Sequence, residues 1–236
     1  HKDKTMFGAS KTNSASTGGY TVSNSLRLRA SNSAYLNRTP ASVGNRKTWT
    51  LSTWVKRGNL SSGDKVIFEA GSSTPWFIIG FADSSDKFFI NFNAGNSGPN
   101  LLTTQVFRDP SAWYHVVLAV DTTQATSTNR IKLYINGLQV TAFDTANYPI
   151  QNYDTQVNYT QTHYFCRNQQ DNSYFDGYLS EVIFIDGQQL TPSSFGATNA
   201  TTGVWQPTRY TGTYGTNGFY LPFSDIALTS GSNAGL

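Results

Sequence analysis

The amino-acid sequence predicts an all-β protein, an antiparallel two-sheet sandwich of the jelly-roll type. Ser, Thr and Asn make up 74 of the 236 residues, whereas Glu occurs only twice, as Glu69 and Glu181. Aromatic residues are 14% of the chain and charged residues 13%, a balance that is atypical of helical bundles and of disordered chains. About a dozen short runs with strand character are separated by turn residues, with no repeat and no alternation of strands with helices.

The first half of the chain predicts a series of short strands. Ser25–Ala30 alternates apolar and basic residues, which places Leu26 and Leu28 in the core and Arg27 and Arg29 outside it. Clusters of Gly, Ser, Asp and Asn provide the turns between the strands that follow. These strands are predicted at Trp49–Lys56, Val66–Ala70, Trp76–Phe81 and Phe88–Asn93.

The clearest local signal lies between Trp113 and Phe143. Trp113–Val120 is predicted to be a buried strand, and Asn136-Gly137 is predicted to join strands Arg130–Ile135 and Leu138–Phe143. Asn-Gly between two alternating runs favours a type I′ hairpin, because both central residues of that turn need positive φ. Later in the chain, we expect one inner strand near Tyr164–Arg167, a strongly apolar strand at Tyr178–Ile185 and a short helix that begins at Thr191-Pro192.

The expected organisation is a flexible arm over residues 1–20, a sandwich over 21–196 and an extension or linker over 197–236. Cys166 is the single cysteine, so no disulfide can form within the chain, and we expect it to be a small buried apolar residue. No apolar run approaches the ~20 residues of a membrane span.

The formal net charge of +3 hides an uneven distribution. Residues 4–63 hold nine basic residues and no acidic one, whereas residues 64–236 carry a net charge of −6. This asymmetry of charge favours an interface with an acidic protein, an anionic polysaccharide or lipid phosphate. The alternative is that the basic residues lie on a solvated strand face without a partner. The candidate interface residues are Arg27, Arg29, Arg38, Arg46, Lys47, Lys56 and Arg57.

Residues 144–176 form a second candidate surface. This stretch holds five Tyr and ten Asn or Gln. Tyr offers rigid contact area and amides offer adaptable hydrogen bonds, as in surfaces that bind glycans or proteins. Packing of the same loop against its own sandwich or a sister subunit is an equal alternative. The candidate binding residues are Tyr148, Asn152, Tyr153, Asn158, Tyr159 and Tyr174.

Three segments together resemble the laminin-G-like, or concanavalin-A-like, family. Trp113-Tyr114-His115-Val116-Val117, followed by Leu133-Tyr134-Ile135-Asn136-Gly137, is similar to the family's central strand and hairpin. Phe175-Asp176-Gly177-Tyr178-Leu179-Ser180-Glu181-Val182 with Leu190-Thr191 is similar to its closing strand and short helix. The resemblance covers about residues 20–196 and implies a jelly-roll sandwich whose opening strand, Leu26-Arg27-Leu28, pairs with the closing strand.

A narrower resemblance reaches about residue 225. It is to virion structural proteins of marine tailed bacteriophages that carry a laminin-G-like domain, and it implies a virion location. The segments that carry it are Ser25-Leu26-Arg27-Leu28-Arg29, Tyr35-Leu36-Asn37-Arg38-Thr39-Pro40, Gly44-Asn45-Arg46-Lys47-Thr48-Trp49-Thr50, Trp54-Val55-Lys56-Arg57-Gly58 and Tyr214-Gly215-Thr216-Asn217-Gly218-Phe219.

Catalysis finds little support in the sequence. Glycosidases of this fold present two carboxylates on one strand face, but neither Glu69 nor Glu181 has an acidic residue two positions away. His115 lies in a buried strand pattern and is expected to be a hydrogen-bonded core residue.

Proteins of the family often hold Ca²⁺ at the sandwich rim, so calcium is a possible cofactor to which the sequence assigns no site. The loop carboxylates of the right type are Asp64, Asp83, Asp86, Asp154, Asp171 and Asp176.

We therefore expect a non-catalytic bacteriophage virion protein that serves particle assembly, decoration or attachment to host-surface glycans, as in a tail fibre. The alternative is a secreted module that binds or hydrolyses glycans. The expected partners are other virion proteins or further copies of the chain, as a homo-oligomer with a trimer favoured, and host surface polysaccharide. Nucleic acid is not expected, because no binding motif accompanies the basic residues.

Overall fold

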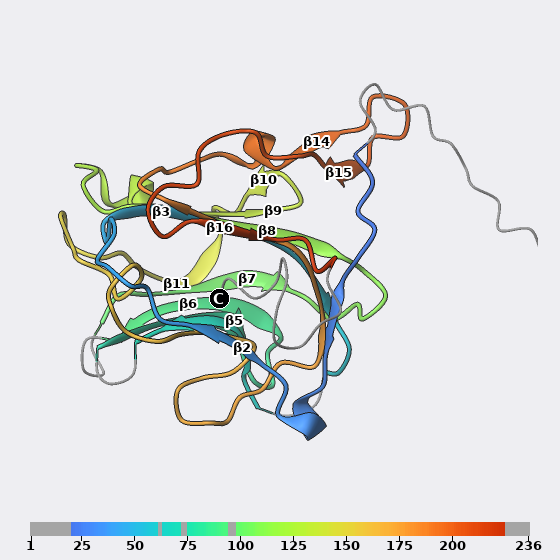
Figure 1. The fold of residues 1–236 in the computed structure, drawn as a ribbon, viewed down its shortest axis with the longest axis horizontal. Coiled ribbons are helices and arrows are strands. Elements are labelled where there is room, and N and C mark those ends of the chain that lie inside the picture. Colours follow the sequence, from blue (N-terminus) through green and yellow to red (C-terminus); the bar gives the residue numbers. More distant parts are fainter. Residues whose placement is uncertain (1–19, 61–62, 72–74, 94–97, 225–236) are drawn as a thin grey trace, which may run out of the picture.

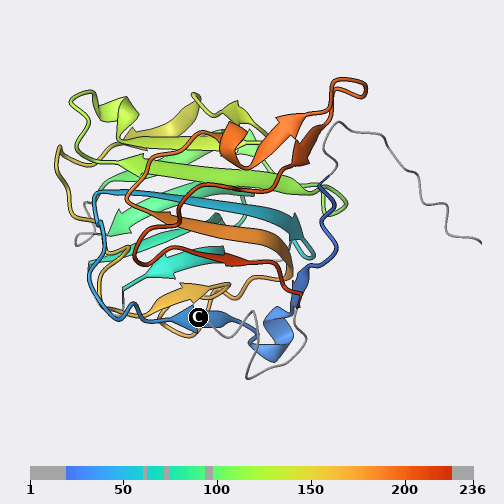
Figure 2. The ribbon, with the colours of Figure 1, turned by 45° about the horizontal axis from the view of Figure 1, so that its top comes forward.

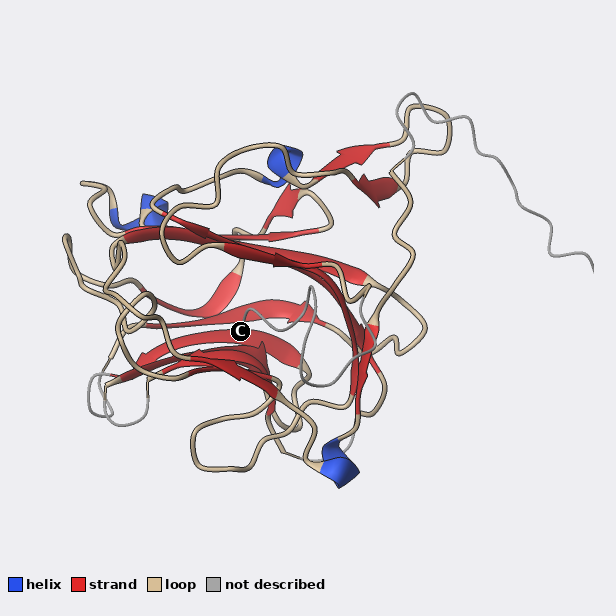
Figure 3. Ribbon diagram, viewed as in Figure 1, coloured by secondary structure: helices blue, strands red, loops and turns tan. Residues whose placement is uncertain are grey.

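A computed structural model of the chain describes residues 20–60, 63–71, 75–93 and 98–224. Two antiparallel sheets of seven strands each lie face to face, joined by loops and three short 3₁₀ helices (Figures 1 and 3). In spatial order, the first sheet, here called sheet A, consists of β1 (Leu26–Leu28), β13 (Gly177–Asp186), β3 (Thr48–Arg57), β8 (Tyr114–Asp121), β9 (Ile131–Ile135) and β10 (Leu138–Gln139), with β16 (Phe219–Leu221) also paired to β13.

The second sheet, here called sheet B, is built mainly from the middle of the chain. Its spatial order is β11 (Phe143–Asn147), β7 (Asn100–Val106), β6 (Lys87–Asn93), β5 (Trp76–Phe81), β4 (Lys65–Ala70), β12 (His163–Phe165) and β2 (Leu36–Arg38). A two-stranded ribbon is formed by β14 (Gly196–Thr198) and β15 (Trp205–Pro207). The 3₁₀ helices are η1 (Ala30–Asn32), η2 (Ser127–Asn129) and η3 (Pro192–Ser194).

The core between the sheets is rich in aromatic rings. Phe77 of β5 meets Trp49 of β3 edge to face, with 5.2 Å between the ring centroids, and Phe92 of β6 at 4.8 Å. The indole N–H of Trp49 donates to the Thr155 hydroxyl at 3.1 Å, so the one polar atom of this buried ring has a partner. Aromatic residues therefore join the two sheets and fix the spacing between them.

The outer face of sheet A is largely covered by the chain's own later segments. A second apolar cluster lies there, in which Phe195 packs with Val117 and Ile183, and Tyr210 and Tyr214 pack against it. Figure 1 shows η3, β14 and β15 above this sheet, and Figure 2 shows β16 running beside β13. Sheet A is thus largely covered on both faces, in agreement with the burial of β8 and β13 along almost their whole length.

Several sequence predictions are confirmed. Leu28 is buried and Leu26 packs against the core, and β1 pairs with β13 through Leu26 opposite Leu179. Asn136 and Gly137 have φ of 50° and 83°, as the predicted hairpin requires. Pro192 begins a one-turn helix, and Cys166 is buried and unpaired.

Other predictions are wrong. The partner of β9 is only two residues long, because the chain leaves sheet A after Gln139 and joins sheet B as β11. The strands β2 and β7 were not predicted. The division of the chain into arm, sandwich and extension stays a prediction: within the expected extension, residues 219–221 form β16 of sheet A and Phe223 is buried in the core, while residues 1–19 and 225–236 lie outside the described residues. Among the described residues, no helix has the length and apolarity that a membrane span would need.

Candidate functional site

A row of seven side chains crosses the outer face of sheet B from edge to edge. Strand pairing places these residues opposite one another, one per strand. Their sequence neighbours, such as Phe68, Phe77 and Ile90, point into the core, and side chains alternate along a strand, so the row faces outward. From β2 to β11 it reads Asn37, Tyr164, Glu69, Ile78, Asn91, Asn100 and Asn147.

A pocket of about 380 Å³ opens over the middle of this row. Its apolar surfaces include the half-buried rings of Trp76 and Phe89 and the side chains of Ile78 and Leu102. Among the described residues, the Trp76 indole N–H forms no hydrogen bond. The polar lining comes from sheet B and from the loop after β12: Asp64, Glu69, Asn91, Asn100, Thr145, Asn168, Gln169 and Gln170.

Glu69 lies in the lining of the pocket and is only 1% exposed. Its Oε2 accepts a hydrogen bond from the backbone N–H of Gln169 at 3.1 Å, whereas its Oε1 has no partner among the described residues. Burial raises the pKa of this carboxyl from 4.5 to about 7, against the opposing effects of the Gln169 hydrogen bond and the Arg167 charge. Near neutral pH the side chain can therefore either donate or accept a hydrogen bond.

The loop after β12 is held over this face by Arg167. The guanidinium carbon lies 4.0 Å from the ring centroid of Tyr35 and 4.4 Å from that of Tyr164, and one nitrogen pairs with Asp171 at 2.5 Å. Cation–π contacts to two rings and an ion pair fix the loop, which sets Gln169 beside Glu69. The pocket is thus bounded on one side by an ordered wall of amide side chains.

Aromatic faces beside several amides suit the recognition of a sugar. A pyranose ring has an apolar face of C–H groups and an edge of hydroxyls, so it needs a flat apolar surface together with hydrogen-bond donors and acceptors. Trp76 and Phe89 supply the surface, and Asn91, Asn100 and Gln170 supply the amides. The arrangement is chemically suited to binding.

The described residues do not form the carboxylate pair of a glycosidase around Glu69. Glu181 belongs to sheet A, where it accepts hydrogen bonds from the hydroxyls of Tyr20 at 2.5 Å and Tyr220 at 2.9 Å. Asp64 lines the pocket but precedes β4, and it lies five positions before Glu69 along an extended chain, roughly 16 Å between Cα atoms. A retaining glycosidase places its two carboxyl groups about 5–5.5 Å apart.

A Ser–His contact in sheet A is also unsuited to catalysis. His115 Nε2 lies 2.9 Å from the hydroxyl of Ser52, but Nδ1 accepts the indole N–H of Trp205 at 2.9 Å. An acceptor at Nδ1 puts the proton on Nε2, so the ring donates to Ser52 and cannot take its proton. Burial lowers the pKa of His115 to about 3, and both residues are 1% exposed. The expectation of a hydrogen-bonded core histidine is confirmed.

A laminin G family model, described as the concanavalin A-like lectin/glucanases superfamily, matches residues 29–194, well over half of the chain. The chain belongs to this superfamily. No curated protein is similar enough in sequence to match it. The two-sheet, all-β architecture of this laminin-G-like domain agrees with the fold class that the sequence predicts.

Solved structures with a similar fold come from several kinds of protein. Domain 4 of AbnA, an extracellular arabinanase from Geobacillus stearothermophilus in complex with arabinotriose, is 16% identical with a TM-score of 0.45, over 63% of this chain and 65% of that one. A heptameric pentraxin from Limulus polyphemus is 16% identical with a TM-score of 0.46, over 66% and 71%. A tailspike protein from an Escherichia coli O157:H7 bacteriophage is 12% identical with a TM-score of 0.49, over 72% and 23%. The chain therefore spans less than two thirds of the arabinanase domain and less than a quarter of the tailspike.

The Tyr and amide residues predicted to bind a partner do not form one surface in this laminin-G-like domain. Tyr148 and Tyr153 pack against the core, and burial raises the pKa of both hydroxyls. Asn158 is 1% exposed, and its amide donates to Asp186 at 2.9 Å. For these three residues the alternative of internal packing is correct, and Asn158 is wrong as a ligand contact.

The other three predicted residues are more accessible and lie on two loops, Asn152 and Tyr159 between β11 and β12 and Tyr174 between β12 and β13. Asn152 is exposed. The ring of Tyr159 lies under the guanidinium of Arg46 at 4.5 Å. Tyr174 belongs to the loop beyond β12, where its hydroxyl donates to Asp171. Binding by Asn152, Tyr159 and Tyr174 stays a prediction.

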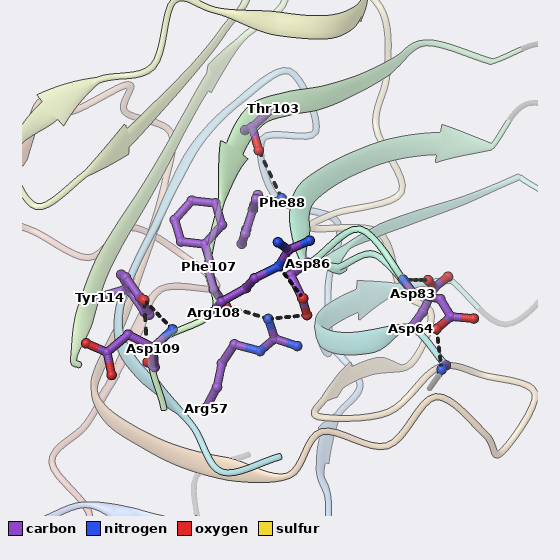
Figure 4. A network of polar contacts seen from close by, with 11 residues as sticks. Arg57, Asp64, Asp83, Asp86, Phe88, Thr103, Phe107, Arg108, Asp109 and Tyr114 are labelled. Carbon is purple, nitrogen blue, oxygen red and sulfur yellow. Dashed lines mark hydrogen bonds and ion pairs between the residues drawn. The ribbon is translucent and has the colours of Figure 1, made fainter. Parts of the chain in front are cut away.

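Arg57 is wrong as an interface residue, because it is 2% exposed. Its guanidinium pairs with Asp86 at 2.9 Å, donates to the Phe107 carbonyl at 2.6 Å and lies 4.6 Å from the ring centroid of Phe81. Figure 4 shows Arg57 and Arg108 converging on Asp86, whose carboxylate the two arginines hold at a pKa below its usual range despite burial. This cation fixes the turn between β5 and β6 to the end of β3.

The remaining basic residues are distributed over both sheets and the loop between β2 and β3. Arg27 pairs with Asp176 at 2.8 Å, Arg38 donates to the Asn217 carbonyl at 2.7 Å, and Arg46 donates to the Thr155 carbonyl at 2.7 Å. These three stabilise loop contacts within the domain. Arg29 is exposed and Lys47 and Lys56 are half-buried, and an interface through these three residues stays a prediction.

The loop aspartates offered as calcium ligands are also dispersed. Asp86, Asp171 and Asp176 each pair with an arginine, and Asp64 and Asp83 accept backbone N–H groups of the turns around them. Across the described ranges, no three His, Cys, Asp or Glu residues form a group suited to a metal ion.

Sequence reasoning missed the pocket residues Trp76, Phe89, Asn91 and Asn100. In the sequence, these residues lie in runs that are almost uniformly apolar or in segments predicted to be turns. The residues that face outward from the sheet were therefore not distinguished from those that face the core. The available signal was alternation: the β6 sequence Phe88-Phe89-Ile90-Asn91-Phe92 sends Phe89 and Asn91 to one side. Gln169 and Gln170 are distant in sequence and reach the pocket only because β12 pairs with β4.

Proposed function

We propose that this laminin-G-like domain is a non-catalytic glycan-binding module and that the pocket on the outer face of sheet B is its binding site. The observation that carries the proposal is the combination of Trp76, Phe89 and several amide side chains in one open pocket of about 380 Å³. The superfamily description names both lectins and glucanases. Binding is favoured over hydrolysis because Glu69 and Glu181 lie on different sheets.

The location of the pocket supports the same conclusion. Sheet A buries most of its outer face beneath Phe195, Tyr210 and Tyr214, whereas the middle of sheet B leaves Trp76 and Phe89 half-exposed. A second hollow, of about 300 Å³, lies beside Trp54 and Trp113 on sheet A and presents a mainly apolar surface. The pocket on sheet B better matches the mixed character of a sugar.

The module is further proposed to act within a bacteriophage virion, in particle assembly or in attachment to host-surface polysaccharide. The support is the resemblance carried by segments such as Tyr35–Pro40 and Trp54–Gly58. Oligomerisation with further copies, a trimer first among them, belongs to the same proposal. Detection of the chain in purified particles by mass spectrometry tests the location, and its absence from particles would reject it.

Two tryptophan variants test the binding site. Trp76→Ala is expected to weaken binding of a neutral hexasaccharide by about tenfold or more, ~1.4 kcal/mol, because it removes the largest apolar surface in the pocket. Trp113→Ala is the matched control, since this half-buried tryptophan lies beside sheet A. The measurement is isothermal titration against β-1,4-linked hexasaccharides of glucose and mannose. Equal loss in both variants, or none in either, would reject the proposed site.

A further inference from the structure

The pocket on sheet B is lined by acidic but not basic side chains. Among its lining residues, Asp64 and Glu69 are the ionisable ones, and neither Lys, Arg nor His contributes. The amides of Asn91, Asn100 and Gln170 are uncharged. A ligand entering the pocket therefore meets dipoles and carboxyl groups, with no cation in the lining to receive a negative charge.

The cation that acts electrostatically on Glu69 is already engaged. Arg167 influences Glu69 electrostatically, but its guanidinium lies between Tyr35 and Tyr164 and pairs with Asp171. Its side chain is 13% exposed. Recruiting it for a ligand would break two ring contacts and an ion pair, so it cannot serve as a free anion receptor.

Glu69 has a hydrogen-bonding position left unused. Its Oε1 is buried and without a partner among the described residues, while Oε2 is held by Gln169. A buried carboxyl oxygen without a hydrogen bond is unfavourable. A sugar hydroxyl can satisfy it as a donor, or as an acceptor when the carboxyl is protonated, whereas an ionised sugar carboxylate can only accept and repels the ionised form.

We infer that the pocket selects uncharged sugars and rejects sugars that carry a carboxylate, with Glu69 as the specificity-determining residue. This rests on the proposed function and names the ligand class of the same site. Uronic acids and sialic acids belong to the rejected class, because each carries a carboxylate that stays ionised above about pH 5. Specificity here arises from repulsion of the wrong ligand as well as attraction of the right one.

The discrimination should depend on pH. Glu69 is largely protonated below pH 7 and ionised above it, since burial raises its pKa to about 7. The charged or titratable groups around it are Asp64 on the approach to β4, Tyr164 on β12, and Arg167 and Asp171 on the following loop. The pKa of Glu69, about 7, lies inside the range from about pH 5.5 to about pH 8.5, so we assign the change in discrimination across that range to Glu69.

Matched oligosaccharides provide the test. β-1,4-mannohexaose and the β-1,4-mannuronate hexamer differ only at C6, as do cellohexaose and its glucuronate counterpart. Isothermal titration at low ionic strength should show at least about tenfold weaker binding of each uronate at about pH 8.5, with a smaller ratio at about pH 5.5. Glu69→Gln should abolish the pH dependence of this ratio, while the control Asp64→Asn should lower the ratio and retain the pH dependence. Thermal melting of both variants checks that they fold.

The outcomes separate the two proposals. Uronates that bind as tightly as the neutral hexasaccharides overturn the inferred selectivity and leave glycan binding standing. A neutral preference that survives unchanged in Glu69→Gln at every pH overturns the role of Glu69. If no hexasaccharide of either kind binds, the proposed function is overturned and the inference falls with it.

Discussion

Replacing Glu69 by Gln keeps the shape of the side chain and removes its proton equilibrium. In the folded domain the pKa of this carboxyl is raised from 4.5 to about 7, because the group is buried. A folded state that holds a proton more tightly than the unfolded state loses stability as pH rises from about 4.5 to about 7. The wild-type protein should therefore lose a contribution to its free energy of unfolding across this window, and the Gln variant should not.

The magnitude follows from the two pKa values. The pKa of Glu69 is 4.5 in the unfolded chain and about 7 in the folded domain. Raising the pH from about 5 to about 8 therefore lowers the free energy of unfolding by about 2.5 kcal/mol. His115 and His163 act in the opposite direction, since burial lowers their pKa values from 6.5 to about 3 and about 4. Each histidine adds about 2 kcal/mol of stability over the same interval. The wild-type profile alone would thus conceal the effect of Glu69.

The assay must therefore compare variant and wild type at each pH, because the histidine contributions cancel in the difference. Urea unfolding at about pH 5 and about pH 8 should show that Glu69→Gln gains about 2.5 kcal/mol on wild type between the two conditions. For a domain of this size the corresponding difference in melting temperature is roughly 5–10 °C. A difference that stays constant with pH would refute the assignment of Glu69 as a buried carboxyl of raised pKa.

Three further predictions concern stability. Arg57→Met should destabilise the domain by about 3–5 kcal/mol in urea unfolding, because it leaves a partly buried aspartate without its closest cation; a loss below about 1 kcal/mol would contradict this. Gly137→Ala should cost more than Gly203→Ala, since both glycines have positive φ but only a Cβ at Gly137 would lie 2.6 Å from the ring of Trp205; equal melting temperatures would refute it. Wild type should lose stability as pH falls from about 7 to about 5, because His115 gains a proton when the chain unfolds. His115→Gln should make this loss about 2 kcal/mol smaller, measured as the free energy of unfolding in urea at each pH. The same pH dependence in variant and wild type would contradict the lowered pKa of His115.

Local patterns in the sequence predicted the fold well. Alternation placed Leu26 and Leu28 in the core, and Asn136-Gly137 predicted its hairpin because only a few residue types tolerate positive φ there. Strand β7 was missed because its second half, Thr104–Val106, is exposed and lacks a buried pattern. The role of residues 197–224 was also missed, because packing of Tyr210 and Tyr214 on sheet A is a long-range contact without a local signal.

The candidate site was harder to predict than the fold. The Tyr-rich loop drew attention by composition, yet Tyr148 and Tyr153 serve the core. Net charge was equally misleading, because Arg57 is neutralised by an aspartate 29 positions later in the chain. The pocket depends on which residues face the same side of neighbouring strands, so Trp76 and Asn100 become part of one site only when the register of β5, β6 and β7 is known.

The most direct test of glycan binding on sheet B is the location of the bound ligand. Nuclear magnetic resonance of the labelled protein, titrated with the neutral hexasaccharide that binds most tightly, reports on individual side chains. Glycan binding at this pocket predicts that shifts concentrate on the indole N–H of Trp76 and the side-chain amides of Asn91, Asn100 and Gln170, with the indole N–H groups of Trp54 and Trp113 unmoved. Shifts confined to Trp54 and Trp113, or no shift at saturating ligand, would contradict it.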